Sequence, residues 1–207
     1  MDAAVISALR RAGEVFGSPA SATPELRWGR VLRELDGAVA PEYVEAIELI
    51  YEGYLLHYRR GRVLEYGGSE TAEATLLAGD FHYALGLHII APRGDVAAVS
   101  LLARLMAACA VFRSLGAAYA DDDALWAYTM AALVALGRGC SAAFLLGPYE
   151  HAENAQASGE PNAVREEVLT VLPSLALPSI APLVHELSGA DLRMEPEWPV
   201  TAEGERR

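Results

Sequence analysis

Residues 41–58 read PEYVEAIELIYEGYLLHY, and residues 74–91 read ATLLAGDFHYALGLHIIA. Both stretches repeat apolar residues at intervals of three and four, which is the spacing of one face of an α-helix. Pro41 opens the first stretch, and Pro92 follows the second. Because proline is tolerated in the first turn of a helix but not in its interior, these prolines mark a helix start and a helix end. The two stretches therefore predict two long helices, and the second is apolar on nearly every side.

The same helical spacing continues through nearly the whole chain, without the alternation of a half-buried β-strand. We therefore predict the all-α fold class, as a bundle of six to eight helices. The bundle is expected to form a single domain over residues 1–189, followed by a flexible tail over 190–207. We expect helices over 2–16, from Thr23 to about Gly37, from Pro41, over 69–91, over 96–117 and over 122–146, a polar loop over 150–160, and a kinked last helix from Pro161 or Asn162.

The charge of the chain excludes several function classes. Its 207 residues carry a formal net charge of -12, and all 16 basic residues are arginine. Without lysine, the chain can form neither a Schiff base nor the lysine contact of a phosphate-binding loop. An acidic chain without a basic run also argues against nucleic acid as a partner, since phosphate binding needs clustered cations.

The compartment is predicted from cysteines and apolar stretches. Cys109 and Cys140 are too few for a disulfide framework, and the first residues, MDAAVISALRRAGEV, do not have the pattern of a signal peptide. The apolar stretch over 168–184 is interrupted by three prolines and is shorter than a membrane span. We therefore expect a cytoplasmic protein without a transmembrane span.

Acidic residues gather at two places. Four glutamates form a row on the helix that starts at Pro41, with His57 near its end. A carboxylate-bridged metal site in a bundle needs Glu-x-x-His on inward faces, which this row lacks, so we expect a solvated face. The second place is Asp121–Asp123, before an apolar helix whose N-terminus favours negative charge, and Asp121 is expected to cap that helix. The row consists of Glu42, Glu45, Glu48 and Glu52.

Local motifs of catalysis are missing from the sequence. It contains no glycine-rich phosphate loop, and none of its serines or cysteines has the context of a nucleophile elbow. His82 and His88 are six residues apart on one predicted helix and point in different directions, so they form no ligand pair. We therefore predict no catalytic residue, no metal ligand and no cofactor.

Three stretches resemble the trans-polyprenyl diphosphate synthase family. AIELIYEGYLLHYRRGRV over 46–63 resembles the helix that leads to the family's Asp-rich motif and Arg-Arg-Gly, and ATLLAGDFHYALGLHIIA over 74–91 resembles its "iLaGDyLlalA" segment. ALWAYTMAALVALGRGCSAAFLLG over 124–147 resembles a later helix, with Tyr128 at the family's tyrosine. The resemblance covers about residues 26–147, and LLAGD is its most distinctive part. It implies a helical bundle of the isoprenoid synthase type, in truncated form.

The departures from the family concern its chemistry. The family's helix is followed at once by Asp-Asp-x-x-Asp, whose carboxylates hold Mg²⁺ against the substrate diphosphate, whereas here His57 is followed by YRRG over 58–61. The family's Lys-Thr pair and its second Asp-rich helix are missing as well. Each lost cation near the leaving group removes about 4 kcal/mol of attraction, and about 1.4 kcal/mol is tenfold in rate. We therefore expect no catalysis by this chain alone.

The resemblance implies a non-catalytic small subunit, similar to component 1 of the heptaprenyl diphosphate synthases. Such a subunit completes a heterodimer with a catalytic polyprenyl diphosphate synthase subunit and influences product chain length. One alternative is a homodimer that binds an isoprenoid chain or another apolar ligand, which requires no metal. Another is a divergent stand-alone prenyl diphosphate or terpenoid enzyme, in which Arg59, Arg60 and Asp121–Asp123 would replace the lost site. The third alternative is a helical bundle that is unrelated to this family.

Candidate site residues follow from the same resemblance. The ligand-pocket candidates lie around the missing metal loop and are Gly53, Tyr54, His57, Arg59, Arg60 and Asp80. Tyr54 is expected either to line the pocket that sets product length or to be an ordinary core residue. The helix over 69–91 has apolar groups on more sides than one neighbouring layer can cover, so we expect it to form the subunit interface. The interface candidates are Leu77, Phe81, Tyr83, Leu85 and His88.

Overall fold

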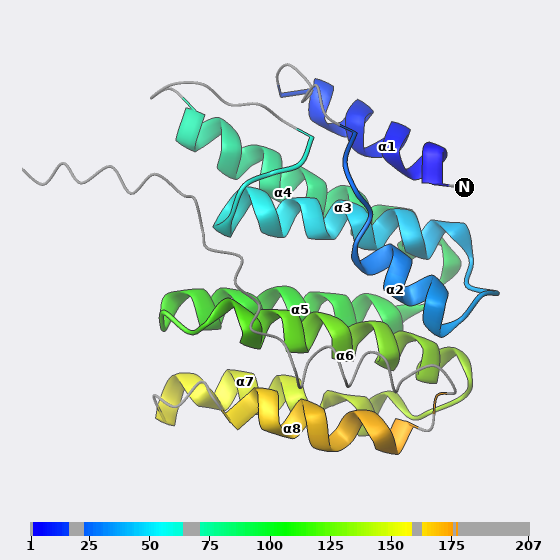
Figure 1. Cartoon of the computed structure of the whole chain (residues 1–207), viewed down its shortest axis with the longest axis vertical. Helices are drawn as coiled ribbons and strands as arrows, with labels where there is room; N and C mark the ends of the chain where they lie inside the picture. Colours follow the sequence, from blue (N-terminus) through cyan, green and yellow to red (C-terminus); the bar gives the residue numbers. More distant parts are fainter. Residues whose placement is uncertain (1, 17–22, 64–70, 159–162, 176, 178–207) are drawn as a thin grey trace, which may run out of the picture.

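The structure, a computed structural model, describes residues 2–16, 23–63, 71–158, 163–175 and 177. Within these ranges it is helical without a β-strand, which confirms the all-α prediction, and its eight α-helices agree with the predicted number (Figure 1). The predicted domain limit at residue 189 and the tail over 190–207 lie outside the described residues. The elements are α1 (Asp2–Glu14), α2 (Trp28–Leu35), α3 (Pro41–Tyr58), α4 (Thr71–Ile90), η1 (Ala91–Arg93), α5 (Val96–Ser114), α6 (Tyr119–Gly137), η2 (Ala142–Leu146), α7 (Gly147–Ser158), α8 (Ala163–Val171) and η3 (Leu172–Leu175).

Three pairs of helices are stacked in layers, and α1 covers α3 on the outside (Figure 1). The pairs are α3 with α4, α5 with α6, and α7 with α8, while α2 packs on both α3 and α6. The contact between α3 and α4 is the most extensive, because glycines let the two backbones approach. A Cβ atom on Gly53 would lie 2.9 Å from the carbonyl oxygen of Gly79, and one on Gly86 would lie 2.7 Å from that of Ala46. These positions therefore fix how α3 and α4 pack.

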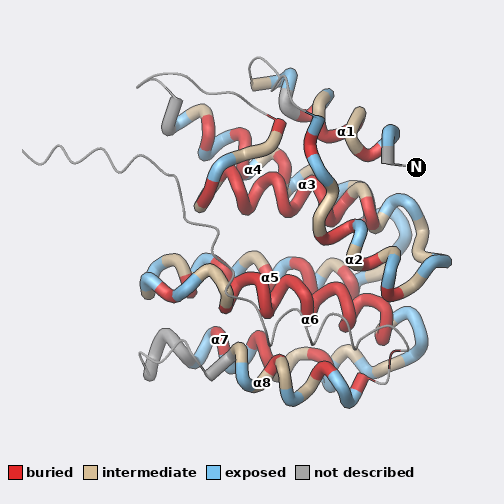
Figure 2. The backbone as a smooth tube through the Cα atoms, viewed as in Figure 1, coloured by how far each residue is buried: buried red, intermediate tan, exposed pale blue. Residues whose placement is uncertain are grey.

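Helix α6 is the centre of the core. Every residue from Asp121 to Ala135 is buried, and Figure 2 shows this run as continuous burial along the helix. Trp126 stacks on Trp28 with ring centroids 5.9 Å apart and meets Tyr51 edge-on at 5.2 Å. Aromatic pairs of this kind each contribute about 0.5–1.5 kcal/mol beyond the burial of their area. The aromatic contacts therefore join α2 and α3 to α6.

Helix α2 begins at Trp28, so the predicted start at Thr23 is wrong. The backbone N–H groups of Arg27 and Gly29 donate to Oε1 of Glu48, at 2.8 and 2.7 Å. A carboxylate can satisfy the free N–H groups of a helix N-terminus in the same way as a capping side chain. The cap of α2 is thus supplied by α3, which the local sequence does not indicate.

Two predictions in the second half of the chain are also wrong. α6 ends at Gly137, well before the predicted end at 146, because Gly139 has a φ of 90° and turns the chain. The predicted polar loop over 150–160 is largely the helix Gly147–Ser158, which has a proline in its first turn.

One helix among the described residues, α5, is long and apolar enough to cross a membrane by length and composition alone. A core helix of a soluble protein passes the same test. The sequence raised this question for 168–184 and not for α5. Only 39% of the apolar window of α5 is buried, so much of this helix lies outside the core.

Candidate functional site

Three consecutive aspartates, Asp121–Asp123, lie in the first turns of α6 and are at most 3% exposed. α6 begins at Tyr119 with Ala118 as its N-cap, so the prediction that Asp121 caps the helix is wrong. The positive end of the helix dipole favours acidic residues at this place. Burial of a charge is nevertheless costly unless the charge is paired. The partners of these carboxylates therefore decide what the cluster does.

Asp122 lies between Arg113 and Tyr54. Its Oδ2 is 2.9 Å from Nε of Arg113 and accepts a hydrogen bond from the Tyr54 hydroxyl. Burial raises the pKa of Asp122 to about 7, although Arg113 opposes the shift. Burial also raises the pKa of Tyr54, so its hydroxyl stays protonated and donates. Asp122 is therefore a carboxyl group that can take up a proton inside the core near neutral pH.

Asp123 is paired with two other arginines. Its Oδ2 lies 3.2 Å from Nη2 of Arg27 and 3.9 Å from Nη2 of Arg59. The guanidinium carbons of Arg59 and Arg113 lie 4.0 and 4.1 Å from the ring centroid of Tyr119, within the range of a cation–π interaction. Three arginines thus converge on the start of α6. We call Arg27, Arg59, Arg113, Asp122 and Asp123 the arginine–aspartate cluster.

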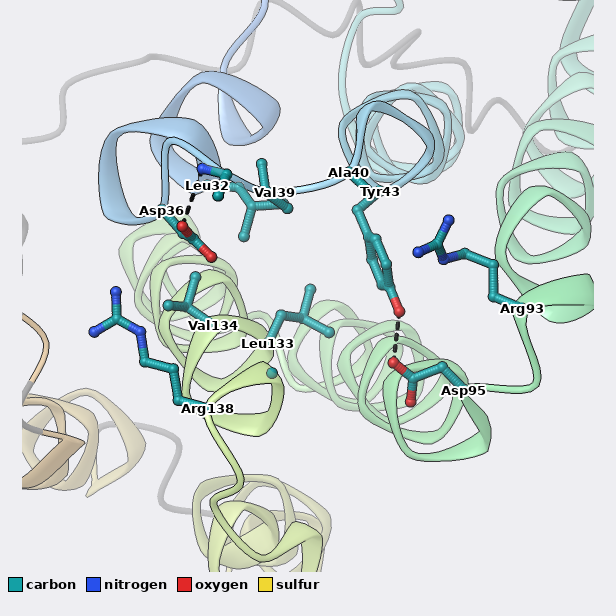
Figure 3. A pocket seen from close by; sticks show the side chains of 12 residues that line it. Leu32, Asp36, Val39, Ala40, Tyr43, Arg93, Asp95, Leu133, Val134 and Arg138 are labelled. Carbon is teal, nitrogen blue, oxygen red and sulfur yellow. Dashed lines mark hydrogen bonds between the residues drawn. The ribbon is translucent and has the colours of Figure 1, made fainter.

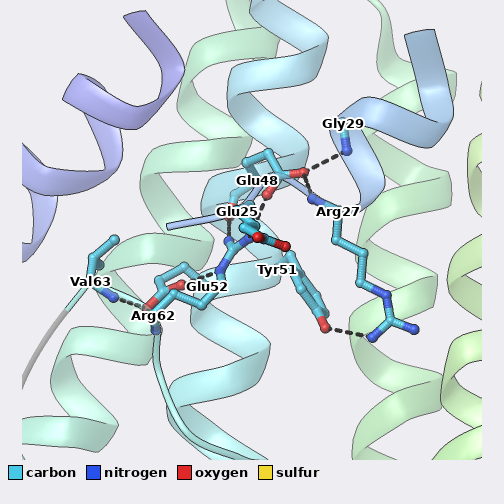
Figure 4. Close-up of polar contacts among 8 residues, drawn as sticks. All are labelled: Glu25, Arg27, Gly29, Glu48, Tyr51, Glu52, Arg62 and Val63. Atoms are coloured by element: carbon cyan, nitrogen blue, oxygen red, sulfur yellow. Dashed lines mark hydrogen bonds and ion pairs between the residues drawn. The ribbon is translucent and has the colours of Figure 1, made fainter. Parts of the chain in front are cut away.

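A second ionic group joins α3 to the segment that follows it (Figure 4). Nη1 of Arg62 is 2.7 Å from Oε2 of Glu48, and its Nε is 2.8 Å from Oε2 of Glu52. Oε1 of Glu52 accepts the backbone N–H groups of Arg62 and Val63. Both glutamates are 0% exposed, so the predicted solvated face is wrong for these two, while Glu42 is exposed. The two carboxylates can be buried because the segment after α3 folds back along the helix and places the guanidinium of Arg62 against them.

Neither ionic group has the composition of a metal centre. Among the described residues, no group of three His, Cys, Asp or Glu side chains is placed to hold a metal ion. The carboxylates face guanidinium groups instead, which neutralise them inside the core. The arrangement can hold charge and exchange a proton at Asp122, but it offers a divalent cation no pair of free carboxylates.

Five of the six pocket candidates lie on α3 or directly after it: His57, which faces Asp80 of α4, and four others. Gly53 is buried between α3 and α4, and Tyr54 is 0% exposed in the aromatic core. Arg59 belongs to the arginine–aspartate cluster. Arg60 is exposed. The structure therefore brings Tyr54 and Arg59 together around Asp122 and Asp123, and leaves Arg60 apart.

The other two pocket candidates meet between α3 and α4. Nε2 of His57 lies 3.1 Å from Oδ1 of Asp80, and the His57 ring stacks on Tyr83 with centroids 5.2 Å apart. The side chain of Asp80 is 71% exposed and that of His57 only 15%, so the pair reaches the surface through Asp80. Of the remaining interface candidates, Leu77 and His88 are exposed, and Phe81 and Leu85 are half-buried.

A pocket of about 280 Å³ lies elsewhere, between the ends of α2 and α6 and the starts of α3 and α5 (Figure 3). Tyr43 donates a hydrogen bond to Oδ2 of Asp95 at 2.5 Å there. The pocket has two basic and two acidic side chains and therefore no preference for one sign of charge. None of the pocket or interface candidates lines it. Its lining is Leu32, Asp36, Ala38, Val39, Ala40, Tyr43, Arg93, Asp95, Leu133, Val134, Gly137 and Arg138.

Sequence reasoning missed Arg27, Arg113 and Arg62 as site residues. A signal exists for Arg113, which is one of only two charged residues in α5. The pairing of Arg27 and Arg62 spans distant parts of the chain and has no local signal.

Comparison of the chain with models of protein families, with curated proteins and with solved structures finds no match. The resemblance to the polyprenyl synthases therefore rests on the residues that carry it.

Proposed function

We propose that the chain is the non-catalytic subunit of a heteromeric polyprenyl diphosphate synthase. In this role it completes a dimer with a catalytic subunit and influences the chain length of the product. The bundle is then a truncated form of the isoprenoid synthase type, and the complex works in the cytoplasm. The proposal starts from the resemblance over residues 26–147 and from its departures.

The burial and the pairing of Arg59 are the observation that supports the proposal most directly. A stand-alone enzyme of this family would need Arg59, Arg60 and Asp121–Asp123 to replace the lost metal site, and of the two arginines Arg60 is exposed. The Arg59 side chain is 8% exposed and is turned to Asp123 and to the ring of Tyr119. Stabilising a leaving diphosphate requires cations aimed at it from the start, and a guanidinium already paired in the core does not supply this. A synthase that contains this chain must therefore take its chemistry from the other subunit.

The surface of α4 supports a role in assembly. Leu77 is 61% exposed and Leu76 is 50% exposed, next to Asp80 on the same side of the helix. Neighbouring leucines on the surface favour association, because each Å² of apolar area removed from water contributes about 25 cal/mol. The catalytic subunit is accordingly expected to dock on α4.

Activity measured with and without a catalytic subunit tests the proposal. The purified chain, given Mg²⁺, isopentenyl diphosphate and farnesyl diphosphate, is expected to make no polyprenyl product above a boiled control. Addition of an Asp-rich synthase subunit from the same genome is expected to give a complex whose product length differs from that of the catalytic subunit alone. Product from the chain by itself, lost in an Asp122→Ala/Asp123→Ala variant, would favour the stand-alone enzyme and contradict the proposal.

A further inference from the structure

The pocket between α2 and α6 is apolar on its inner side and charged at its two ends (Figure 3). Leu32, Leu133 and Val134 form the inner side and are at most 8% exposed. The volume of about 280 Å³ lies just below the range of about 300–1,000 Å³ that ligand pockets usually have. The pocket therefore has the size for one small molecule with an apolar part and a polar part.

The charged groups at the end formed by α3 and α5 are already paired. Oδ1 of Asp95 accepts the backbone N–H of Ala98, and its Oδ2 accepts the hydroxyl of Tyr43. Burial raises the pKa of Tyr43 to about 12, so the hydroxyl keeps the proton that it donates. Nη1 of Arg93 is 3.6 Å from Oε2 of Glu42. This end therefore closes the pocket with side chains that already have partners.

The opposite end is formed by the C-terminal ends of α2 and α6 and carries Asp36 and Arg138 (Figure 3). Asp36 is the C-cap of α2, and its Oδ1 accepts the backbone N–H of Ala38. Arg138 is the C-cap of α6. Within the described part of the chain, neither Oδ2 of Asp36 nor the guanidinium of Arg138 forms an ion pair or a hydrogen bond. The two groups thus share one end of the pocket without neutralising each other.

We propose that this pocket binds a free α-amino acid with an aliphatic side chain. The ammonium group contacts Oδ2 of Asp36, and the carboxylate contacts the guanidinium of Arg138, which can donate two parallel hydrogen bonds to it. Because an α-amino acid carries both charges on one carbon, it can bridge two side chains that do not reach each other. Its aliphatic side chain packs against the inner side of the pocket, away from water.

Charge favours a zwitterion over an ion of either sign. The net charge of -12 repels a free anion from the chain. A simple cation would pair with Asp36 but would leave the guanidinium of Arg138 beside it without an anion. A zwitterion has no net charge and pairs with both. The ammonium group is placed at Asp36 because α2 ends there, and the C-terminal end of a helix favours a positive charge.

The inference does not rest on the proposed function. None of the site candidates that follow from the resemblance lines this pocket, so an amino-acid site and a synthase subunit can fail independently of each other. A bound amino acid joins the ends of α2 and α6. It therefore stabilises the fold by an amount that grows with its concentration.

Calorimetric titration of the full chain with L-leucine tests the proposal. We expect saturable binding with a Kd below about 1 mM and, in amide NMR spectra, shifts at Ala38 and Gly137, which line the pocket. Isocaproate is leucine without the ammonium group, and isopentylamine is leucine without the carboxylate. Each is expected to bind at least about 10-fold more weakly than leucine, because a charge-assisted hydrogen bond is lost.

Two variants test the contacts separately. Asp36→Asn and Arg138→Gln should each weaken leucine binding at least about 10-fold. Asp36→Asn should leave the weak binding of isocaproate unchanged, since that probe has no ammonium group, and Arg138→Gln should leave that of isopentylamine unchanged. Asp36 is half-buried and Arg138 is exposed, so both variants should keep the fold, which circular dichroism checks. Arg30→Gln is the matched control, because the Arg30 side chain is 66% exposed on α2 and lies outside the pocket.

Three results would overturn the proposal. One is the absence of saturable leucine binding. Another is binding of isocaproate or isopentylamine as tight as that of leucine, which would make the pocket a site for a single charge. The third is an affinity for leucine that either Asp36→Asn or Arg138→Gln leaves unchanged, since the amino acid would then not bridge these two side chains.

Discussion

Replacing Arg62 by methionine removes the cation that lies between two carboxylates with no exposure to solvent. Nη1 and Nε of Arg62 are 2.7 and 2.8 Å from Glu48 and Glu52, and both glutamates are 0% exposed. Removing one partner of a buried ion pair costs about 3–5 kcal/mol, because the remaining charge is left without compensation. A domain of this kind has a total stability of about 5–15 kcal/mol. Arg62→Met is therefore expected to lose a large part of the free energy of unfolding.

Urea unfolding followed by circular dichroism at 222 nm measures this loss. Arg30→Met is the matched control, because Arg30 and Glu34 are 3.8 Å apart with both side chains mostly exposed, and such pairs contribute about 0–1 kcal/mol. The triple variant Arg62→Met/Glu48→Gln/Glu52→Gln should recover most of the stability, since glutamine oxygens can still accept the backbone N–H groups. A loss below about 1 kcal/mol in Arg62→Met would refute the reasoning, and so would a triple variant no more stable than the single one.

Two further substitutions test the arginine–aspartate cluster and the α3–α4 contact. Burial raises the pKa of Asp122 to about 7, above about 3.9 in an unfolded chain, so the folded state binds the proton more tightly and stability falls as pH rises from 4 to 7. Asp122→Asn should remove up to about 4 kcal/mol of this pH dependence. The free energy of unfolding is measured in urea at pH 5 and at pH 8, and a difference between the two pH values that is the same for wild type and variant would contradict the assignment. Gly53→Ala would place a Cβ atom 2.7 Å from Cδ1 of Tyr83 and 2.9 Å from the Gly79 carbonyl oxygen, so it should cost about 1–3 kcal/mol. Gly37→Ala, where a Cβ atom meets nothing within 4 Å, is expected to be neutral, and thermal unfolding that shows equal losses for the two would argue against a tight contact.

The helices were largely predictable, because periodicity and proline are local signals. Pro41 begins α3, as predicted, and α5 starts at Val96, the predicted position, where Asp95 caps it by accepting the N–H of Ala98. The polar helix α7 was not predicted, since its composition is that of a loop and its stability comes from packing on α5 and α8. The proline in its first turn was the one usable signal.

The ionic groups could not be predicted from spacing. Glu48 and Glu52 have the same three- and four-residue spacing as the exposed Glu42, and only the return of Arg62 to α3 makes them buried. A sequence pattern shows which residues share a side of a helix, but not which distant segment covers that side. For the same reason Asp122 and Asp123 were interpreted as dipole partners of α6, whereas Arg27 and Arg113 come from other parts of the chain.

The convergence of arginines on the start of α6 has a consequence for how the molecule unfolds. Arg27 precedes α2, Arg59 follows α3, and Arg113 is in α5, yet all three pair with Asp122 or Asp123. Separating the layer of α3 and α4 from the layer of α5 and α6 would break the pairs of Arg27 and Arg59 with Asp123 and the hydrogen bond from Tyr54 to Asp122, while Arg113 and Asp122 lie in one layer and stay together. It would also expose apolar surface such as that of Trp126 to water, without the conformational entropy that full unfolding gains. A partly opened state is therefore disfavoured relative to both the folded and the fully unfolded chain. These two layers should melt as one cooperative unit, although each is a helix pair with its own apolar contacts.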